Sequence, residues 1–593
     1  MKRERNVMVA MRDGVRLATD LYFPDGDGPW PVLLERTPYD KLGTELVKSA
    51  GFFARHGYAV ALQDVRGREV SEGEWYPFRE EGPDGYDTCG WLVQQPWCNG
   101  QIGTIGLSYS GCTQVGLGAL GAPGLASQWI SMGPQNYRDS AMRQGGAMEL
   151  RFYIYAFRMA ATSKEAQADP VKRIALQRAH NEVGKFLLPP GRVPPKAGLT
   201  PLKYTPGIER WVHDVLRHGD YRPYWSDAPA LSILERYDTY PDVAITYMSS
   251  WYDTYVRGTI GNYVEMTKRH KSPTRLLMGP WTHGGQGVAF SGDVEFGPDA
   301  ALHYDDARLR WFDATVRGRD AAALAKEPPV SIFVMGGGSG RKTPAGRMMH
   351  GGTWRQLPAW PPAGAEARAL HLRAGGRLTW EAPAAGEAAD RYVYDPADPV
   401  PTVGGSISAA ENIIPAGGYD QRDGPRVFGS RDDLPLSARA DVLVYSSEPL
   451  AKDLEVTGAV EVVLWCASSA VDTDFTAKLI DAYPSNPDYP EGYELNVADS
   501  IVRARYRSNG ESADPPLEPG RPYELRIRLY ATSNVFCAGH RIRVHVSSSN
   551  YPRFDPNPNT GAPLGESQVT ERALQTVYHD VDRPSRVILP VMG

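Results

Sequence analysis

The chain of 593 residues has no long hydrophobic run and few cysteines. No stretch approaches the roughly 18 consecutive apolar residues that cross a membrane, and the basic N-terminus lacks the apolar segment of a secretory signal. The cysteines are odd in number and include no C-x-x-C pair; they are Cys89, Cys98, Cys112, Cys466 and Cys537. This usage predicts reduced, mostly buried thiols without a zinc site, in a soluble cytoplasmic protein with no membrane partner.

The sequence also lacks an excess of positive charge. Its 64 Lys and Arg residues face 70 Asp and Glu residues, a formal net charge of −6, so nucleic acid is not an expected partner. A hydrophobic fraction of 42% with 23% charged residues excludes intrinsic disorder. The 61 glycines and 49 prolines indicate many turns and long connections. At roughly 150 residues per domain, the length is enough for about four domains.

Three kinds of pattern divide the chain. Residues 1–134 alternate strand-like and helix-like segments, which indicates a mostly parallel sheet covered by helices on both faces. The pattern breaks over 135–236, where helical segments and a Pro-rich loop predict an inserted helical cap, and it resumes over 237–320. From 321 to 593, short segments such as 523–530 alternate apolar and polar residues, which predicts an antiparallel sandwich of the jelly-roll type.

The sharpest local signal is the run G-L-S-Y-S-G at 106–111, between a strand-like and a helix-like segment. A nucleophile elbow places its serine on a strained strand-to-helix turn and needs small residues two positions before and after it. Gly106 and Ser110 meet this need around Ser108, the predicted nucleophile. Ser110 is a rival, but its own neighbours at these positions, Ser108 and Cys112, fit less well.

The serine needs a base and an acid that orients the base, and in this fold class they follow in the order Ser, Asp, His at the ends of later strands. Asp253 comes just after one strand-like segment and His283 just after the next, so these two are the predicted partners. Asp64 also ends a strand but precedes the serine, and we interpret it as structural, in an ion pair with Arg66 or Arg68.

Hydrolysis also needs donors aimed at the developing oxyanion. The backbone N–H of Tyr109, directly after the nucleophile, is one candidate. The second donor usually comes from an earlier strand-to-helix loop, here residues 36–41, in which Tyr39 could supply a phenol hydroxyl. An aromatic ring packed against the cap is the alternative for Tyr39.

Several longer motifs follow one another along the chain; they are R-T-P-Y-D-K (36–41), D-V-R-G (64–67), Q-P-W-C-N-G (95–100), G-L-S-Y-S-G (106–111), W-Y-D (251–253), G-P-W-T-H-G (279–284) and the segments 467–479, 532–543 and 547–555. In these motifs the chain resembles the cocaine-esterase-like hydrolases. That group also includes the α-amino-acid ester hydrolases, the glutaryl acylases and the X-prolyl dipeptidyl-peptidases. The resemblance covers nearly the whole chain.

The resemblance implies an α/β-hydrolase core, a helical cap inserted between nucleophile and acid, and a C-terminal jelly roll packed against both. By position it implies Ser108 as nucleophile, His283 as base and Asp253 as orienting acid. It also implies an oxyanion hole made by the Tyr39 hydroxyl, characteristic of the family, and the Tyr109 amide. The walls of the substrate pocket would include Trp251, Tyr252, Trp281, Phe152, Tyr155 and Met159. For the last three, all on a cap helix, packing within the cap is an equal alternative.

Substrates divide this family. In its α-amino-acid ester hydrolases, acidic residues shortly after the catalytic Asp help to hold the substrate ammonium, whereas here Asp253 is followed by Thr254, Tyr255 and Val256. This departure favours a neutral acyl group. Glu149 in the cap could supply an anionic contact, although we interpret it as part of a solvated helix face.

Three functional hypotheses follow. The first is a serine hydrolase that cleaves a small-molecule carboxylic ester through an acyl-enzyme, without metal or other cofactor. The second is an acylase or X-prolyl dipeptidyl-peptidase that cleaves an amide. The third, of a different class, is a carbohydrate- or protein-binding module with a vestigial hydrolase core; the intact set of Ser108, Asp253 and His283 argues against it. A homo-oligomer is left open.

Overall fold

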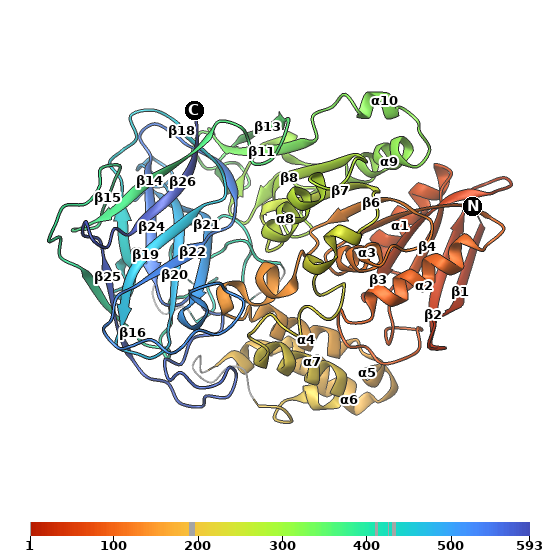
Figure 1. The fold of residues 1–593 in the computed structure, drawn as a ribbon, viewed down its shortest axis with the longest axis horizontal. Helices are drawn as coiled ribbons and strands as arrows, with labels where there is room; N and C mark the ends of the chain where they lie inside the picture. Colours follow the sequence, from red (N-terminus) through yellow and green to blue (C-terminus); the bar gives the residue numbers. More distant parts are fainter. Residues whose placement is uncertain (1, 189–195, 409–412, 425, 430–433) are drawn as a thin grey trace.

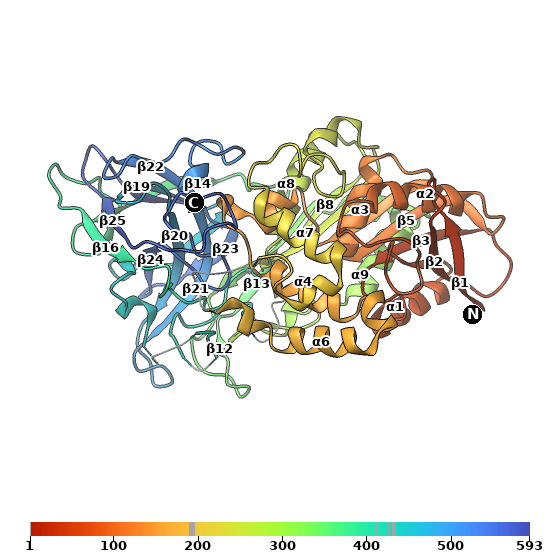
Figure 2. The same cartoon turned by 90° about the horizontal axis from the view of Figure 1, so that it is seen from below.

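The computed structural model describes every residue of the chain except 1, 189–195, 409–412, 425 and 430–433. Figures 1 and 2 show a β-rich C-terminal region at one end of the molecule, an α/β region at the other and a group of helices near the middle. This arrangement confirms the predicted fold class, an α/β-hydrolase core with an inserted helical cap and a C-terminal β domain.

One twisted sheet forms the centre of the α/β region, with strand order β1-β2-β4-β3-β5-β6-β7-β8. These strands are β1 (Lys2–Ala10), β2 (Arg16–Phe23), β3 (Trp30–Thr37), β4 (Ala59–Asp64), β5 (Cys98–Leu107), β6 (Leu125–Ser131), β7 (Ala244–Tyr252) and β8 (Thr274–Thr282). All pairs from β4 to β8 are parallel, whereas β1 and β2 add antiparallel pairs at one edge. The sequence patterns missed β1, because an edge strand with few buried residues shows no apolar run.

Helices cover both faces of this sheet. They are α1 (Thr44–Arg55), α2 (Glu81–Val93), α3 (Tyr109–Ala119), α8 (Val256–Thr267) and α9 (Tyr304–Thr315). Buried residues of α1 and α9 share one hydrophobic cluster, which includes Phe53 and Phe312. Helices α2, α3 and α8 contribute to two further clusters, with Leu92, Val115 and Met266 as examples. The sheet is therefore buried between two helical layers, as its alternating pattern predicts.

The cap lies between β6 and β7 in the chain. Its helices are α4 (Arg151–Ala161), α5 (Lys164–Ala168), α6 (Pro170–Asn181) and α7 (Pro206–Arg217). The helix-forming sequence over 148–168 gives two helices, α4 and α5, because the Ser163 hydroxyl accepts a hydrogen bond from the Ala166 amide and starts a new helix. Part of the predicted Pro-rich loop, residues 189–195, lies outside the described residues.

The C-terminal region is built from two antiparallel ladders. One has the order β17-β24-β20-β21 and the other β16-β25-β19-β26-β14. Their bounds are β14 (Ala365–Arg373), β16 (Asp390–Tyr394), β17 (Leu443–Ser446), β19 (Glu461–Ser468), β20 (Asp474–Tyr483), β21 (Tyr493–Arg503), β24 (Arg541–Ser547), β25 (Ala573–Tyr578) and β26 (Arg586–Met592). Strands of both ladders share one apolar core.

The expected alternation is present in β22 (Tyr523–Arg528), a strand that pairs with β19. Leu525 and Ile527 are buried in this strand, whereas Arg526 and Arg528 are exposed. The two-layer arrangement agrees with the predicted sandwich, and its finer description as a jelly roll stays a prediction.

One strand joins the two regions. Strand β11 (Val330–Gly336) pairs in parallel with β8 through Val330–Ile332 and with β23 (Thr532–Phe536) through Met335 and Gly336. The core sheet therefore continues past residue 320, where the sequence patterns place the start of the β domain.

Each of the five cysteines is a free thiol, and three of them are fully buried. Within the part of the chain that the structure describes, we find no helix with both the length and the apolarity required to cross a bilayer.

Candidate active site

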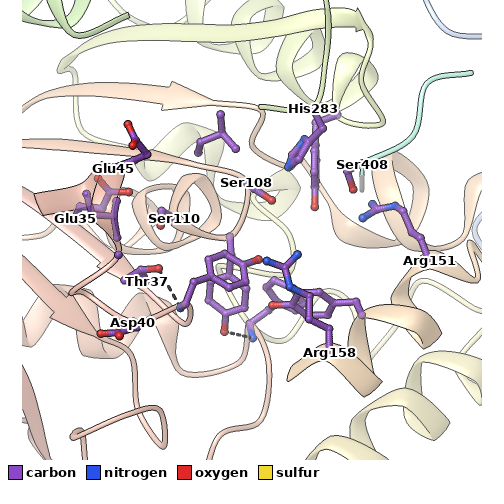
Figure 3. A pocket seen from close by; sticks show the side chains of 18 of the residues that line it. Glu35, Thr37, Asp40, Glu45, Ser108, Ser110, Arg151, Arg158, His283 and Ser408 are labelled. Atoms are coloured by element: carbon purple, nitrogen blue, oxygen red, sulfur yellow. Dashed lines mark hydrogen bonds between the residues drawn. The ribbon is translucent and has the colours of Figure 1, made fainter. Parts of the chain in front are cut away.

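Ser108 occupies the sharp turn between β5 and α3. Its backbone has φ 64° and ψ −115°, a left-handed conformation that costs a non-glycine residue free energy. Backbone hydrogen bonds hold this turn: the Ser108 amide donates to the Ser131 carbonyl and the Cys112 amide donates to the Ser108 carbonyl, both at 3.0 Å. The turn presents Ser108 at the carboxyl edge of the sheet, on the wall of a cavity (Figure 3).

The chain packs closely on both sides of this turn. A Cβ added to Gly106, which has φ 143°, would lie 2.4 Å from the Cβ of Ser110. Small residues are therefore required at both positions, as the elbow pattern assumes. Ser110 lies in the first turn of α3 and is 3% exposed, so the strained position belongs to Ser108 and not to its rival.

Asp253 and His283 follow the carboxyl ends of the adjacent strands β7 and β8, and they meet. His283 Nδ1 lies 3.1 Å from Asp253 Oδ1. The same carboxylate accepts hydrogen bonds from the Tyr255 amide at 3.1 Å and from the Ser249 hydroxyl at 3.3 Å, and it has no exposure to solvent. A buried acceptor at Nδ1 keeps the proton there and leaves Nε2 of His283 as the basic nitrogen. His283 lines the same cavity as Ser108 (Figure 3).

Tyr39 follows β3 and lines the mouth of this cavity. The residue is 37% exposed, and its ring lies edge-on to the rings of Tyr109 and Tyr155, each with a centroid separation of 6.3 Å. Although one side of the ring reaches solvent, the surroundings of the hydroxyl are largely desolvated, and this raises the pKa of Tyr39 above its ordinary value. A phenol is protonated at neutral pH even at its ordinary pKa, so the Tyr39 hydroxyl can act as a hydrogen-bond donor.

An ion pair anchors the loop that carries Tyr39, and it corrects one expectation. Asp64 pairs with Lys41 at 2.6 Å and accepts the Lys41 amide at 2.8 Å, rather than pairing with Arg66 or Arg68. Burial raises the pKa of Asp64 to about 6, and Lys41 opposes this shift. Arg66 instead pairs with Asp84 at 2.6 Å. Asp64 therefore has a structural role, as the sequence predicts, but its partner Lys41 lies in the loop after the neighbouring strand β3.

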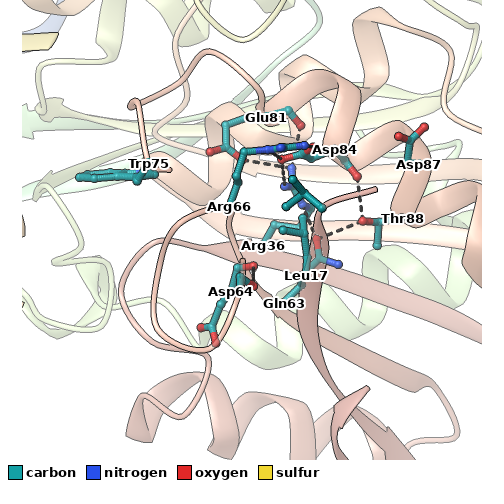
Figure 4. A network of polar contacts seen from close by, with 12 residues as sticks. Leu17, Arg36, Gln63, Asp64, Arg66, Trp75, Glu81, Asp84, Asp87 and Thr88 are labelled. Atoms are coloured by element: carbon teal, nitrogen blue, oxygen red, sulfur yellow. Dashed lines mark hydrogen bonds and ion pairs between the residues drawn. The ribbon is translucent and has the colours of Figure 1, made fainter. Parts of the chain in front are cut away.

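The side chain of Tyr109 reaches a buried polar network, and Figure 4 shows the part of this network around Arg36, Arg66, Glu81 and Asp84. The Tyr109 hydroxyl donates to Glu81 at 2.7 Å and accepts from the Trp75 indole at 3.1 Å and from the Phe78 amide at 3.0 Å. Burial raises the pKa of the Glu81 carboxyl, and the Arg36 guanidinium at 3.1 Å opposes this shift. The residue after Ser108 is thus fixed through its side chain, which holds its backbone amide in place at the start of α3.

The cavity at this site has a volume of about 590 Å³ and an aromatic lining. Phe152 and Tyr155, two of the predicted substrate-binding residues, line it from the cap helix α4. Figure 3 also shows its charge distribution: Glu35, Asp40 and Glu45 lie on one side of Ser108, and Arg151 and Arg158 lie on the other.

Four predicted pocket residues lie elsewhere, and this is a correction. Trp251, Tyr252, Trp281 and Met159 are buried but are not among the residues that line the cavity. The Trp251 indole donates to the Phe333 carbonyl and the Trp281 indole to the Ala300 carbonyl, both at 2.7 Å. In a strand, alternate side chains point to opposite faces, so aromatic residues beside a catalytic loop can point into the core.

Glu149 is also a correction, because it does not lie on a solvated helix face as expected. Its side chain is fully buried, and its carboxylate accepts from Arg151 Nε at 2.6 Å and from the Thr254 hydroxyl at 3.3 Å. Arg553 of the β domain lies 3.5 Å from the same carboxylate. The sequence around Glu149 predicts a solvent-facing carboxylate, because its partners come from distant segments of the chain.

Sequence reasoning missed Arg151 and Arg158 as residues of the cavity. Their spacing in α4 carried a signal, since Arg151, Tyr155 and Arg158 are related as i, i+4 and i+7 and so share one face of the helix. All three line the cavity. Two arginines on the face of a helix that also carries an aromatic residue indicate a functional surface.

Comparison with known proteins finds relatives over nearly the whole chain. Residues 13–285 match the model of the X-Pro dipeptidyl-peptidase (S15 family), and residues 322–588 match the X-Pro dipeptidyl-peptidase C-terminal non-catalytic domain. The chain is 36% identical to the cocaine esterase of Rhodococcus sp. (strain MB1 Bresler), over 99% of this chain and 98% of the relative.

Two solved structures share its architecture. The structure of a selenomethionine-labelled α-amino acid ester hydrolase has a TM-score of 0.77 and 27% identity, and covers 100% of this chain and 96% of its own. The crystal structure of an aminopeptidase from the marine sediment archaeon Thaumarchaeota archaeon has a TM-score of 0.77 and 25% identity, with the same coverage.

The fold and these relatives define an enzyme, a serine ester hydrolase of the α/β-hydrolase type. Within that class, the chain belongs to the X-Pro dipeptidyl-peptidase (S15) family and is similar over its whole length to cocaine esterase.

Proposed function

We propose that this enzyme hydrolyses carboxylic esters through an acyl-enzyme formed on Ser108. The Ser108 oxygen attacks the ester carbonyl while His283 Nε2 accepts its proton, and the alcohol then leaves with that proton. A water molecule, deprotonated by His283, attacks the acyl-enzyme and releases the carboxylic acid. The observation that carries this proposal is the 3.1 Å hydrogen bond from His283 to the buried Asp253, beside the same cavity as the strained Ser108.

Two donors would stabilise the negative charge on the carbonyl oxygen. The Tyr109 amide is the first N–H of α3, where amides have no partner within the helix. The Tyr39 hydroxyl is the second, supported by its position on the cavity wall.

We further propose that the acyl half of the substrate carries no ammonium group. Residues 254–256 after Asp253 are Thr, Tyr and Val, with no acid. The cap side of the cavity presents Arg151 and Arg158, and Glu149 is already engaged by Arg151. An ammonium beside these cations would be repelled, and leaving it unpaired in a buried site costs several kcal/mol. The same argument disfavours a dipeptidyl-peptidase activity, because that substrate has a free N-terminal ammonium.

The test has two parts. Wild-type enzyme should hydrolyse p-nitrophenyl acetate, and a serine-directed reagent should abolish this activity. The value of kcat/KM should then be compared for phenylglycine methyl ester and phenylacetic acid methyl ester, which differ only in the amine. We expect the phenylacetate ester to be hydrolysed at least as well. A strong preference for the amino ester would contradict the proposal.

We also propose a cytoplasmic location, which the absence of disulfides among the five cysteines supports. Cell fractionation with an antibody against the chain tests it.

A further inference from the structure

Helix α6 forms the outer edge of the cap. Figures 1 and 2 show it on the side of the cap that faces away from the core sheet, with α4 on its inner side. Leu176 and Ala179 of α6 pack into the same hydrophobic cluster as Phe157 of α4. The outward side of α6 carries apolar residues as well: Val171 is 73% and Ile174 is 65% exposed. These two are related as i and i+3, so they share one face of the helix.

A third exposed aliphatic residue lies beside this face. Leu199 is 74% exposed and comes two residues before the short helix Pro201–Tyr204, which packs against α6. Val171, Ile174 and Leu199 are three of the four most exposed large hydrophobic residues in the part of the chain that the structure describes. Exposed apolar residues are usually scattered singly, and a group of them marks a contact surface.

The cap carries positive charge in an otherwise acidic protein. Residues 135–236 contain 16 Lys and Arg against 10 Asp and Glu, a net charge of +6, whereas the whole chain has a net charge of −6. The excess is concentrated in residues 170–203, which contain seven basic residues and a single acidic one, Glu182. Glu182 is already engaged by Lys185 at 2.8 Å and by Arg178 at 3.6 Å.

Unpaired basic residues flank the exposed aliphatic ones. Arg173, for example, is exposed on α6 between Val171 and Ile174. Four basic residues of this segment form no ion pair with any described residue; they are Lys172, Arg173, Lys196 and Lys203. Together with Val171, Ile174 and Leu199 they make up a surface that we call the cap face.

The combination of charge and apolar groups indicates what the cap face would contact. A second copy of the chain that docked through the same face would bring two positively charged caps together, and like charges repel. Single aliphatic side chains between basic ones instead match the interface of a bilayer. There the apolar atoms enter the boundary of the acyl chains, while ammonium and guanidinium groups stay with the lipid phosphates.

From these observations we propose that the cap face binds peripherally to a membrane surface that contains anionic phospholipids. The proposal goes beyond ester hydrolysis and differs from the absence of a membrane partner that the sequence predicts. Anionic lipids are abundant on the cytoplasmic side of membranes, in keeping with the proposed location. Helix α4 packs against α6 and lines the catalytic cavity through Tyr155, so binding would hold the cavity near esters dissolved in the membrane.

The experiment measures co-sedimentation of the full-length enzyme with lipid vesicles. One set of vesicles contains phosphatidylcholine alone, and the other contains equal parts of phosphatidylcholine and phosphatidylglycerol. At a salt concentration of about 0.1 M, we expect at least about tenfold tighter binding to the anionic vesicles. This binding should weaken several-fold at about 0.5 M salt, because the charges are then screened.

The double variant Lys172→Gln/Arg173→Gln tests the contribution of charge. Each basic residue near an anionic surface contributes roughly fivefold to the affinity, so the variant should bind at least about tenfold more weakly. Lys268→Gln/Lys271→Gln is the matched control, because it removes two positive charges at the end of α8 in the core. Its affinity should stay within about twofold of wild type.

The double variant Val171→Ser/Ile174→Ser tests the contribution of the apolar groups. Its affinity for anionic vesicles should fall at least about fivefold, because fewer apolar atoms enter the lipid. Val569→Ser is the control, since Val569 is 67% exposed but lies in the β domain. All the substituted side chains lie on the surface, and unchanged melting temperatures would show that the variants are folded.

Two results would overturn the proposal: equal binding of wild-type enzyme to both kinds of vesicle, or unchanged binding of Lys172→Gln/Arg173→Gln. A third would do so as well. If Val171→Ser/Ile174→Ser binds like wild type, the attraction is one of charge alone, and the surface would fit an acidic protein instead of a membrane. The assay does not depend on catalysis, so none of these results affects the proposed ester hydrolysis, and an enzyme that binds vesicles but hydrolyses no ester would refute only the latter.

Discussion

Thr254, the residue directly after Asp253, donates its hydroxyl to the buried carboxylate of Glu149 at 3.3 Å. Glu149 also lies 3.5 Å from Arg553 of the C-terminal β domain and binds Arg151 of the cap. One carboxylate therefore connects the catalytic-acid loop, the cap helix and the β domain. The segment that carries Asp253 is therefore in contact, through Thr254 and Glu149, with residues about 100 and 300 positions away in the chain.

This connection predicts a large effect for Glu149→Gln. Without this charge, Arg151 and Arg553 lose a buried anionic partner. Breaking a buried ion pair lowers the free energy of unfolding by about 3–5 kcal/mol. We expect a lower melting temperature and a lower kcat with p-nitrophenyl acetate. Glu45→Gln, which alters an exposed carboxylate at the same cavity, should stay within about 0.5 kcal/mol of wild type. Equal melting temperatures of the two variants would contradict the assigned connection.

Ser108→Ala should be almost inactive. Loss of a catalytic serine lowers kcat by on the order of 10⁶ in comparable hydrolases. Ser110→Ala is the matched control, two residues away in the first turn of α3, and should keep much of its activity. Steady-state kinetics with p-nitrophenyl acetate measure both. The assignment is wrong if mass spectrometry finds a phosphonate adduct on Ser110.

Tyr39→Phe removes one hydroxyl at the mouth of the cavity. An oxyanion donor acts more in the transition state than in the ground state, so kcat should fall by roughly 10²–10³ with little change in KM. The control Tyr155→Phe removes a neighbouring hydroxyl of the same cavity and should lower kcat far less. A rise in KM alone would make Tyr39 a packing or substrate-binding residue.

Tyr109→Phe removes the hydroxyl that joins Glu81, Trp75 and the Phe78 amide. These buried groups lose a partner, and each unsatisfied group costs about 1–3 kcal/mol, so the melting temperature should fall. We expect a moderate loss of kcat as well, because the side chain fixes the Tyr109 amide. Tyr263→Phe on α8, whose hydroxyl makes no hydrogen bond in the described part of the chain, is the control. If Tyr109→Phe melts at the same temperature as Tyr263→Phe, the network contributes little to the stability of the fold.

Several features could be predicted from the sequence because they are local. Gly106 and Ser110 around Ser108 show the steric requirement of a strained turn directly in the residue types. Asp253 and His283 follow strand-like segments, and parallel strands bring their carboxyl ends to one edge of a sheet. The alternation of Leu525 and Ile527 with arginines shows one buried face of a strand. These patterns were sufficient for the fold class and for the candidate catalytic residues.

The tertiary structure decided which side chains reach the cavity. Trp251 and Trp281 lie beside the catalytic loops in sequence but point into the core, where carbonyls of distant segments accept their indole N–H groups. Glu149 meets Thr254 of the catalytic-acid loop and Arg553 of the β domain, and no local pattern around Glu149 could identify these partners. Local sequence specifies the conformation of a turn and the buried face of an element, whereas charge pairing and cavity lining depend on contacts between residues far apart in the chain.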